Sequence, residues 1–176
     1  MTKLLGISGA LRAQSTNTAL VRTATEIFAP TSFTQANLRL PLYDGDLETT
    51  EGIPDDVQAL SDQIADADAV IISSPEYNKA LSGVLKNALD WVSRTKGHPW
   101  AGKPVAIMSA TAGRSGGERA QSSLILCLAP FRPLLIMGPE VLVGSNYEAF
   151  DDKGTLSNEV NLKAIAELMD KLKAAI

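Results

Sequence analysis

The sequence predicts a doubly wound α/β domain, built on a parallel sheet of five strands with helices on both faces. Short apolar runs alternate with segments of helical period along the 176 residues, and this alternation is typical of a parallel sheet covered by helices. The runs at residues 3–8 and 69–73 are apolar almost throughout, as expected of strands buried on both faces. No linker, repeat or low-complexity tract divides the chain, so we expect one domain over residues 1–176.

The first half of the chain follows this alternation closely. After the strand at 3–8, residues 17–28 carry Leu20, Val21, Ala24, Ile27 and Phe28 on one side, which predicts a helix. A weaker strand is expected at 34–40, and a long polar loop at 39–52. The helix expected at 54–67 begins at Pro54 and has acids at 55 and 56, which suit a first turn and the positive end of the helix dipole. The central strand, Ala-Val-Ile-Ile-Ser, follows at 69–73.

The second half of the chain continues the alternation of strands and helices, but its last strand is interrupted. Apolar residues at helical spacing predict a helix at 81–94, and Gly138-Pro139 interrupts the last strand. The remaining elements are a strand at 104–109, a helix at 116–128, a fifth strand at 134–143 and an amphipathic helix at 162–176.

Composition excludes several classes of protein. Sixteen basic and 20 acidic residues give a net charge of −4, which argues against nucleic acid or an anionic membrane as the main partner. The single cysteine, Cys127, lies in an apolar run. We therefore expect its side chain to be buried as a small hydrophobic group, and no disulfide within the chain. With one histidine, His98, no metal site of Cys/His spacing is expected. No apolar signal region or bilayer-length segment is present, so the expected compartment is the cytoplasm.

The first loop of interest follows the first strand. In doubly wound folds ligands bind outside the carboxyl ends of the strands, which selects the loops after Ser8, Ser73 and Ser109. The first contains Arg12, and Ser15, Thr16 and Asn17 at the helix start, where unpaired N–H groups and the dipole attract an anion. Ordinary N-capping would explain one polar residue but not the run with an arginine. Because the dinucleotide and P-loop fingerprints are absent, a single terminal phosphate fits best.

The second and third loops have other chemistry. Pro75 makes the loop at 73–79 stiff, and Tyr77 could form a flat wall for a planar ligand. Asn78 is placed to cap the following helix; a plain turn of Pro and Asn is the alternative. The third loop, 109–119, has glycines at 113, 116 and 117. They indicate either a close approach to the backbone or a flexible segment.

Two blocks of the sequence resemble the NADPH-dependent FMN reductase family. Ser8-Gly9-Ala10-Leu11-Arg12 with Ser15 and Asn17 is similar to its phosphate loop, and the run from Ser74-Pro75-Glu76-Tyr77-Asn78 to Arg94 is similar to its most specific motif. Ala10 stands where the family usually has Ser, which removes one possible hydroxyl. Ser82 stands where the family usually has Pro, so the start of the helix expected at 81–94 is expected to be less rigid. The resemblance covers roughly residues 3–145.

The resemblance implies a flavodoxin-like three-layer fold with strand order 2-1-3-4-5, bound FMN, NAD(P)H as co-substrate, and a homodimer or homotetramer. It implies an oxidoreductase that passes electrons to quinones, chromate, ferric complexes or azo compounds. Because NAD(P)H and the acceptor would use the same face of the flavin, we expect a ping-pong mechanism. Hydride transfer needs no acid, base or nucleophile, so no catalytic side chain is expected. The alternatives are a flavodoxin-type electron carrier without NAD(P)H activity and a flavin-free phosphate-binding domain. The implied FMN-binding residues are Ser8, Arg12, Ser15, Thr16, Asn17, Pro75, Glu76, Tyr77, Asn78, Ser109 and Gly113.

Overall fold

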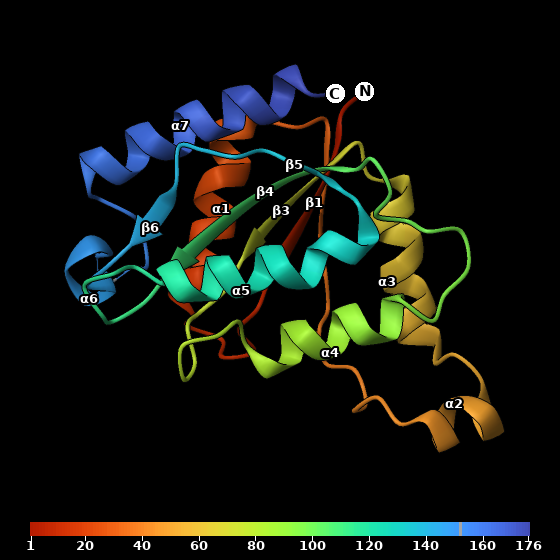
Figure 1. Cartoon of the computed structure of the whole chain (residues 1–176). Helices are drawn as coiled ribbons and strands as arrows, with labels where there is room; N and C mark the ends of the chain where they lie inside the picture. The colour runs from red at the N-terminus through yellow and green to blue at the C-terminus, as the bar shows by residue number, and fades with distance from the viewer. Residues whose placement is uncertain (152) are drawn as a thin grey trace.

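The computed structural model describes residues 1–151 and 153–176 and has the predicted architecture (Figure 1). Its strands are β1 (Lys3–Ser8), β2 (Ser32–Gln35), β3 (Ala69–Ser73), β4 (Pro104–Ala110), β5 (Leu134–Leu135) and β6 (Val141–Val143). They form one sheet in the order β2-β1-β3-β4-β5, and β6 also pairs with β4. Every pairing is parallel, so the carboxyl ends of the strands share one edge.

Helices cover both faces of this sheet. They are α1 (Thr16–Phe28), α2 (Gly45–Glu51), α3 (Asp55–Asp66), α4 (Gly83–Val92), α5 (Glu118–Leu128), α6 (Asn146–Ala149) and α7 (Glu159–Ala174), with a 3-10 turn at Ala129–Phe131. The helices α1 and α7 lie on one face and α3, α4 and α5 on the other (Figure 1). Each face has its own hydrophobic core, so the fold is the predicted three-layer, flavodoxin-like one.

The central strands lie where the sequence predicts them, but the edge strands do not. The prediction of a strand at 34–40 is wrong. The strand β2 begins at Ser32, which pairs with Lys3 of β1, and it ends at Gln35. Its residues are all exposed, whereas Ala36 and Leu38 beyond it are buried in the core. The apolar alternation therefore marks a buried segment that has already left the sheet.

The last predicted strand is two strands. Between β5 and β6 the chain passes through a cis peptide bond at Gly138-Pro139, and proline has no N–H to donate to a ladder. The predicted loop at 39–52 contains α2, whose N-cap is Asp44, and α6 was also not predicted. Both helices are short, and α2 buries no residue, so neither has a strong apolar period.

Two smaller features complete the fold. Cys127, which the sequence placed in the core, is half-buried on α5. Trp91 and Trp100 are both buried. Within the described residues, none of the helices combines the length and the apolar character that crossing a bilayer requires.

Candidate functional site

A cleft of about 270 Å³ lies at the carboxyl edge of the sheet, and all three predicted loops contribute to it. We call it the central cleft. Its lining residues are Ala10, Arg12, Ser15, Thr16, Asn17, Pro75, Glu76, Tyr77, Thr111, Ala112 and Asn146. Residues far apart in the sequence therefore meet where the topology predicts a ligand site.

One end of the central cleft presents hydrogen-bond donors. Ser15 is the N-cap of α1, and its Oγ accepts from the N–H of Asn17 at 3.1 Å. The Thr16 hydroxyl accepts from Asn146 Nδ2 at 2.8 Å, so the hydroxyl hydrogens of both residues stay available. Among the described residues nothing accepts from the N–H groups of Thr16 or Thr18. Together with the exposed guanidinium of Arg12, these groups can hold an anion.

Asn17 and Ser8 hold the framework beneath this end. Asn17 is 2% exposed; its Nδ2 donates to the carbonyl of Ala110, and its Oδ1 accepts from the Ser73 hydroxyl and the Ala110 N–H. One side chain thus joins the start of α1 to the ends of β3 and β4. The Ser8 hydroxyl accepts from Thr18 Oγ1 at 2.8 Å and does not line the cleft.

The second loop also lines the central cleft. Pro75, Glu76 and Tyr77 line it, and the Tyr77 side chain is 57% exposed. Asn78 does not line the cleft. It forms a tight turn with Lys79, and both residues have positive φ. The residues on either side of this turn, Tyr77 and Ala80, are joined by backbone hydrogen bonds. The interpretation of Asn78 as a helix cap is wrong, because Ser82 caps α4.

The start of α4 is fixed despite lacking the family's proline. Ser82 is buried; its Oγ accepts from the N–H of Leu85, and its N–H donates to the Ser74 hydroxyl. The Ser74 hydroxyl donates in turn to the carbonyl of Pro75. These hydrogen bonds cap α4 and connect its start to the second loop.

Glu76 joins the second loop to the third. The N-cap of α5 is Gly117, which offers no side-chain cap. The Glu76 carboxylate takes that place: its Oε2 accepts from the N–H groups of Arg119 and Ala120 at 3.2 and 3.4 Å. A negative charge at a helix N-terminus is favourable, so Glu76 holds the beginning of α5 against the cleft.

The third loop contributes residues that the sequence did not single out. Thr111 and Ala112 line the central cleft, whereas Ser109 and Gly113 do not. The buried Ser109 hydroxyl donates to the carbonyl of Gly116 and accepts from Gln121 Nε2. The carbonyl of Gly113 accepts from the N–H groups of Gly116 and Ser145. Both residues shape the loop from within.

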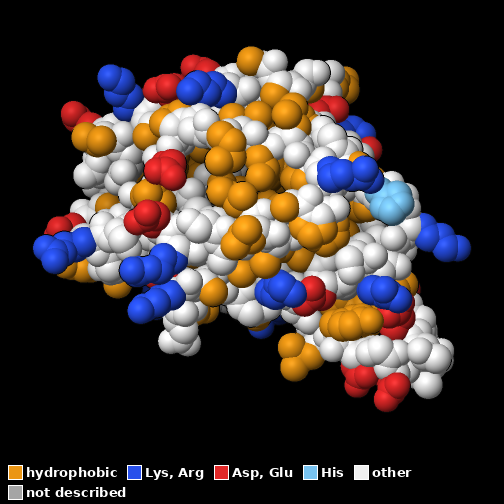
Figure 2. Space-filling view, viewed as in Figure 1, with side chains coloured by type: hydrophobic (Ala, Val, Ile, Leu, Met, Phe, Trp, Pro, Cys, Tyr) orange, Lys and Arg blue, Asp and Glu red, His pale blue; other side chains and the backbone are white. Residues whose placement is uncertain are grey.

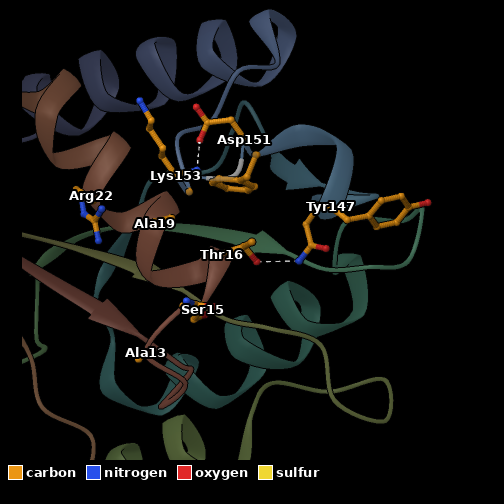
Figure 3. A pocket seen from close by; sticks show the side chains of 12 residues that line it. Ala13, Ser15, Thr16, Ala19, Arg22, Tyr147, Asp151 and Lys153 are labelled. Carbon is orange, nitrogen blue, oxygen red and sulfur yellow. Dashed lines mark hydrogen bonds between the residues drawn. The ribbon is translucent and has the colours of Figure 1, made fainter.

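Asn146 is the other lining residue that sequence reasoning missed. It follows β6, whose carboxyl end lies at the same edge of the sheet as that of β4, so the rule that selected the three loops also points to it. The hydrogen bond that Thr16 accepts from Asn146 is the dashed line at Thr16 in Figure 3, which views a neighbouring cavity of about 460 Å³; this cavity shares Ser15, Thr16 and Asn146 with the central cleft. That larger cavity includes no residue of the second or third loop, so the central cleft is the candidate site.

Comparisons with known proteins identify the family of the chain. The model of the family described as NADPH-dependent FMN reductase matches residues 2–148. An NAD(P)H-dependent FMN reductase from Pseudomonas aeruginosa is 39% identical over 173 residues, covering 97% of this chain and 93% of the relative. A quinone reductase from Escherichia coli is 37% identical over 183 residues, covering 97% of each. Among solved structures, the flavoenzyme NAD(P)H:(acceptor) oxidoreductase FerB from Paracoccus denitrificans has a TM-score of 0.85 at 28% identity, with 99% of each chain covered. The chain belongs to the NADPH-dependent FMN reductase family.

Proposed function

We propose that the protein is an FMN-dependent NAD(P)H oxidoreductase that reduces quinones and similar small acceptors. One observation carries the proposal: a single cleft joins anion-binding donors at the start of α1 to the exposed ring of Tyr77 on a loop fixed by internal hydrogen bonds. A mononucleotide needs both ends, a charged one for its phosphate and a flat one for its ring system. The names of the relatives support the cofactor and both substrates.

The residues of the central cleft fit FMN. The hydroxyls of Ser15 and Thr16, the N–H group of Thr16 and the guanidinium of Arg12 would hold the phosphate. Pro75, Glu76 and Tyr77 on one side and Thr111 and Ala112 on the other would border the flavin ring. Asn17 and Ser8 act by holding this framework, since their polar atoms are already bonded within the protein.

Bound FMN supplies the electron-transfer chemistry, and the protein orients the reactants around it. We assign no side chain as an acid, base or nucleophile, because hydride transfer needs none. NAD(P)H and the acceptor are proposed to use the same opening beside Tyr77 in turn, which gives ping-pong kinetics. Quinones are the best supported acceptors, and chromate, ferric complexes and azo compounds remain in the proposal. The cytoplasm, where NAD(P)H is available, is the proposed compartment.

A homodimer or homotetramer is also part of the proposal. Leu126 on α5 and Met137 after β5 are 74% and 69% exposed, and Leu134 in β5 is 48% exposed. Figure 2 shows hydrophobic side chains gathered on the face that carries α5. An apolar area of this kind on an otherwise polar surface is typical of an interface between copies.

Replacing Arg12 by alanine should weaken FMN binding. A charge-assisted hydrogen bond contributes about 1.5–3 kcal/mol, which corresponds to roughly a tenfold or larger rise in the dissociation constant. Arg12 donates to the carbonyl of Gln14 and lines the cleft, so the arginine is pre-oriented. Quenching of FMN fluorescence by the apoprotein measures the constant. An unchanged constant would remove Arg12 from the phosphate site.

The function itself is tested by mixing the FMN-loaded protein with NADPH in the absence of oxygen. We expect the flavin absorbance near 450 nm to bleach with no acceptor present, and to return when 1,4-benzoquinone is added. Parallel double-reciprocal plots are expected in the steady state. If the protein binds FMN but NADPH does not bleach the flavin, the protein is an electron carrier. If the protein takes up no FMN, it is neither a reductase nor a flavodoxin-type carrier.

A further inference from the structure

A second cavity, of about 530 Å³, adjoins the central cleft. Its volume lies within the range of small-molecule sites, ~300–1,000 Å³. The two cavities share Arg12 and Tyr77, so a molecule in one abuts whatever the other holds. Four aliphatic side chains, Leu11, Leu40, Leu42 and Val84, line the second cavity together with Tyr77. The polar groups of Arg12, Ser82 and Asn87 are few by comparison.

Two of the lining residues, Leu40 and Leu42, belong to the segment 40–51, which we call the arm. It carries α2 and projects from the body of the molecule beside α4 (Figure 1). Leu42 on the arm is 82% exposed although it lines the cavity. An exposed leucine needs no explanation by itself, but this one is held in place on both sides.

Asn87 of α4 clips the arm around Leu42. Its Nδ2 donates to the carbonyl of Pro41 at 2.9 Å, and its Oδ1 accepts from the N–H of Tyr43 at 2.9 Å. The indole N–H of the buried Trp91 donates to the same Pro41 carbonyl at 2.8 Å, and the Tyr43 ring packs edge-on against Trp91 with centroids 5.0 Å apart. The residues before and after Leu42 are thus fixed, and Leu42 is presented to the cavity.

A second anchor holds the far part of the arm. Arg94 Nε donates to both carboxylate oxygens of Glu48, at 3.1 and 2.9 Å, and the Tyr43 hydroxyl donates to Glu48 Oε2 at 3.0 Å. The hydrogen bond from Arg94 lowers the pKa of the Glu48 carboxyl below its usual value, so this ion pair persists at neutral pH. The arm is therefore docked at two places rather than loose.

We propose that the second cavity binds the flat, apolar acceptor, and that Leu42, positioned by Asn87, determines selectivity for it. This inference rests on the proposed function and deepens it by naming where the acceptor is chosen. A quinone ring would bury its faces against the aliphatic walls and Tyr77, while Asn87 acts only through the arm that it holds. In the overall reaction the quinone gains two electrons and two protons: NAD(P)H supplies a hydride, and solvent supplies the second proton.

The physical basis for selection is the apolar surface that each acceptor can bury. Burying a leucine side chain against a ligand is favourable in proportion to the apolar surface removed from water. A naphthoquinone offers such surface, whereas ferricyanide is a hydrated anion that offers none. Leu42 on the arm should therefore strengthen the binding of naphthoquinone and leave the binding of ferricyanide unchanged.

The test compares Leu42→Ser and Asn87→Ala with Val160→Ser, which changes an equally exposed residue on α7 outside both cavities. The first readout is calorimetric binding of 2-naphthol to the FMN-loaded protein without NADPH. The second is the ratio of kcat/KM for 1,4-naphthoquinone to that for ferricyanide. We expect naphthol affinity and this ratio to fall about tenfold in Leu42→Ser and in Asn87→Ala, and to stay at the wild-type value in Val160→Ser.

Naphthol affinity that is the same in Leu42→Ser as in the wild type would overturn the inference. If sedimentation then also showed that Leu42→Ser turns a dimer into a monomer, a second copy of the chain would cover the cavity in place of the acceptor. Naphthol binding does not need turnover, so absence of NADPH bleaching would refute the proposed function without affecting this readout.

Discussion

Replacing Asn17 by alanine is expected to lower the free energy of unfolding by about 3–5 kcal/mol, since each buried polar group left without a partner costs about 1–3 kcal/mol. The substitution strands three groups: the N–H and the carbonyl of Ala110 and the hydroxyl of Ser73. It also releases the start of α1 from the ends of β3 and β4. FMN affinity should fall too, because Thr16 and Ser15 lie on the turn that Asn17 anchors.

Urea titration followed by far-UV circular dichroism measures this loss, with Asn37→Ala as the matched control. Asn37 is exposed, and its Oδ1 accepts one bond, from the N–H of Arg39. Surface substitutions of this kind change stability by about 0.5 kcal/mol or less. Equal midpoints for the two variants would show that the Asn17 bonds do not hold the three elements together.

Asn17 also shows what the sequence could and could not predict about the site. The rule that ligands bind at the carboxyl edge selects the loop correctly, and Arg12, Ser15 and Thr16 do line the cleft. The same rule cannot separate an amide that faces a ligand from one that bonds inward. That depends on Ser73 and Ala110, which are 56 and 93 residues away, and on no local pattern.

The sequence also predicts the central strands of the sheet better than the edge strands. The strands β1 and β3 lie at the predicted residues, and β4 differs by one, because strands buried on both faces are continuous apolar runs. The strand β2 is exposed along its length, and β5 and β6 have two and three residues. Such edges carry too few buried side chains to leave a period in the sequence.

The glycines of the third loop leave two interpretations open in the sequence, close approach or flexibility, and the structure favours the first. What approaches is the protein's own backbone. A Cβ added to Gly116 would lie 2.5 Å from the carbonyl carbon of Leu142, and one added to Gly144 would lie 2.4 Å from the carbonyl oxygen of Arg114. The loop that carries Thr111 and Ala112 is thus packed closely against β6 and Gly144, which follows it.

Gly116→Ala should therefore lower the free energy of unfolding by about 3 kcal/mol, from about 1–2 kcal/mol for a side chain in the left-handed region and about 1–3 kcal/mol for the forced shift of packed atoms. Gly116 has a φ of +64°, and the clash is with backbone, which cannot rotate away. Weaker FMN binding should accompany the loss, since the shift displaces the wall of the cleft opposite Tyr77.

Gly113→Ala is the control within the same loop, read for stability alone. Its φ is not positive, and the nearest atom to an added Cβ is Thr111 Oγ1 at 4.0 Å. Alanine at such a site leaves stability unchanged or raises it by up to about 1 kcal/mol, because it restricts the unfolded chain. Chemical denaturation of both variants decides the matter. If Gly116→Ala were as stable as Gly113→Ala, the third loop would be a flexible lid whose glycines serve motion, and the packed wall derived for the central cleft would be wrong.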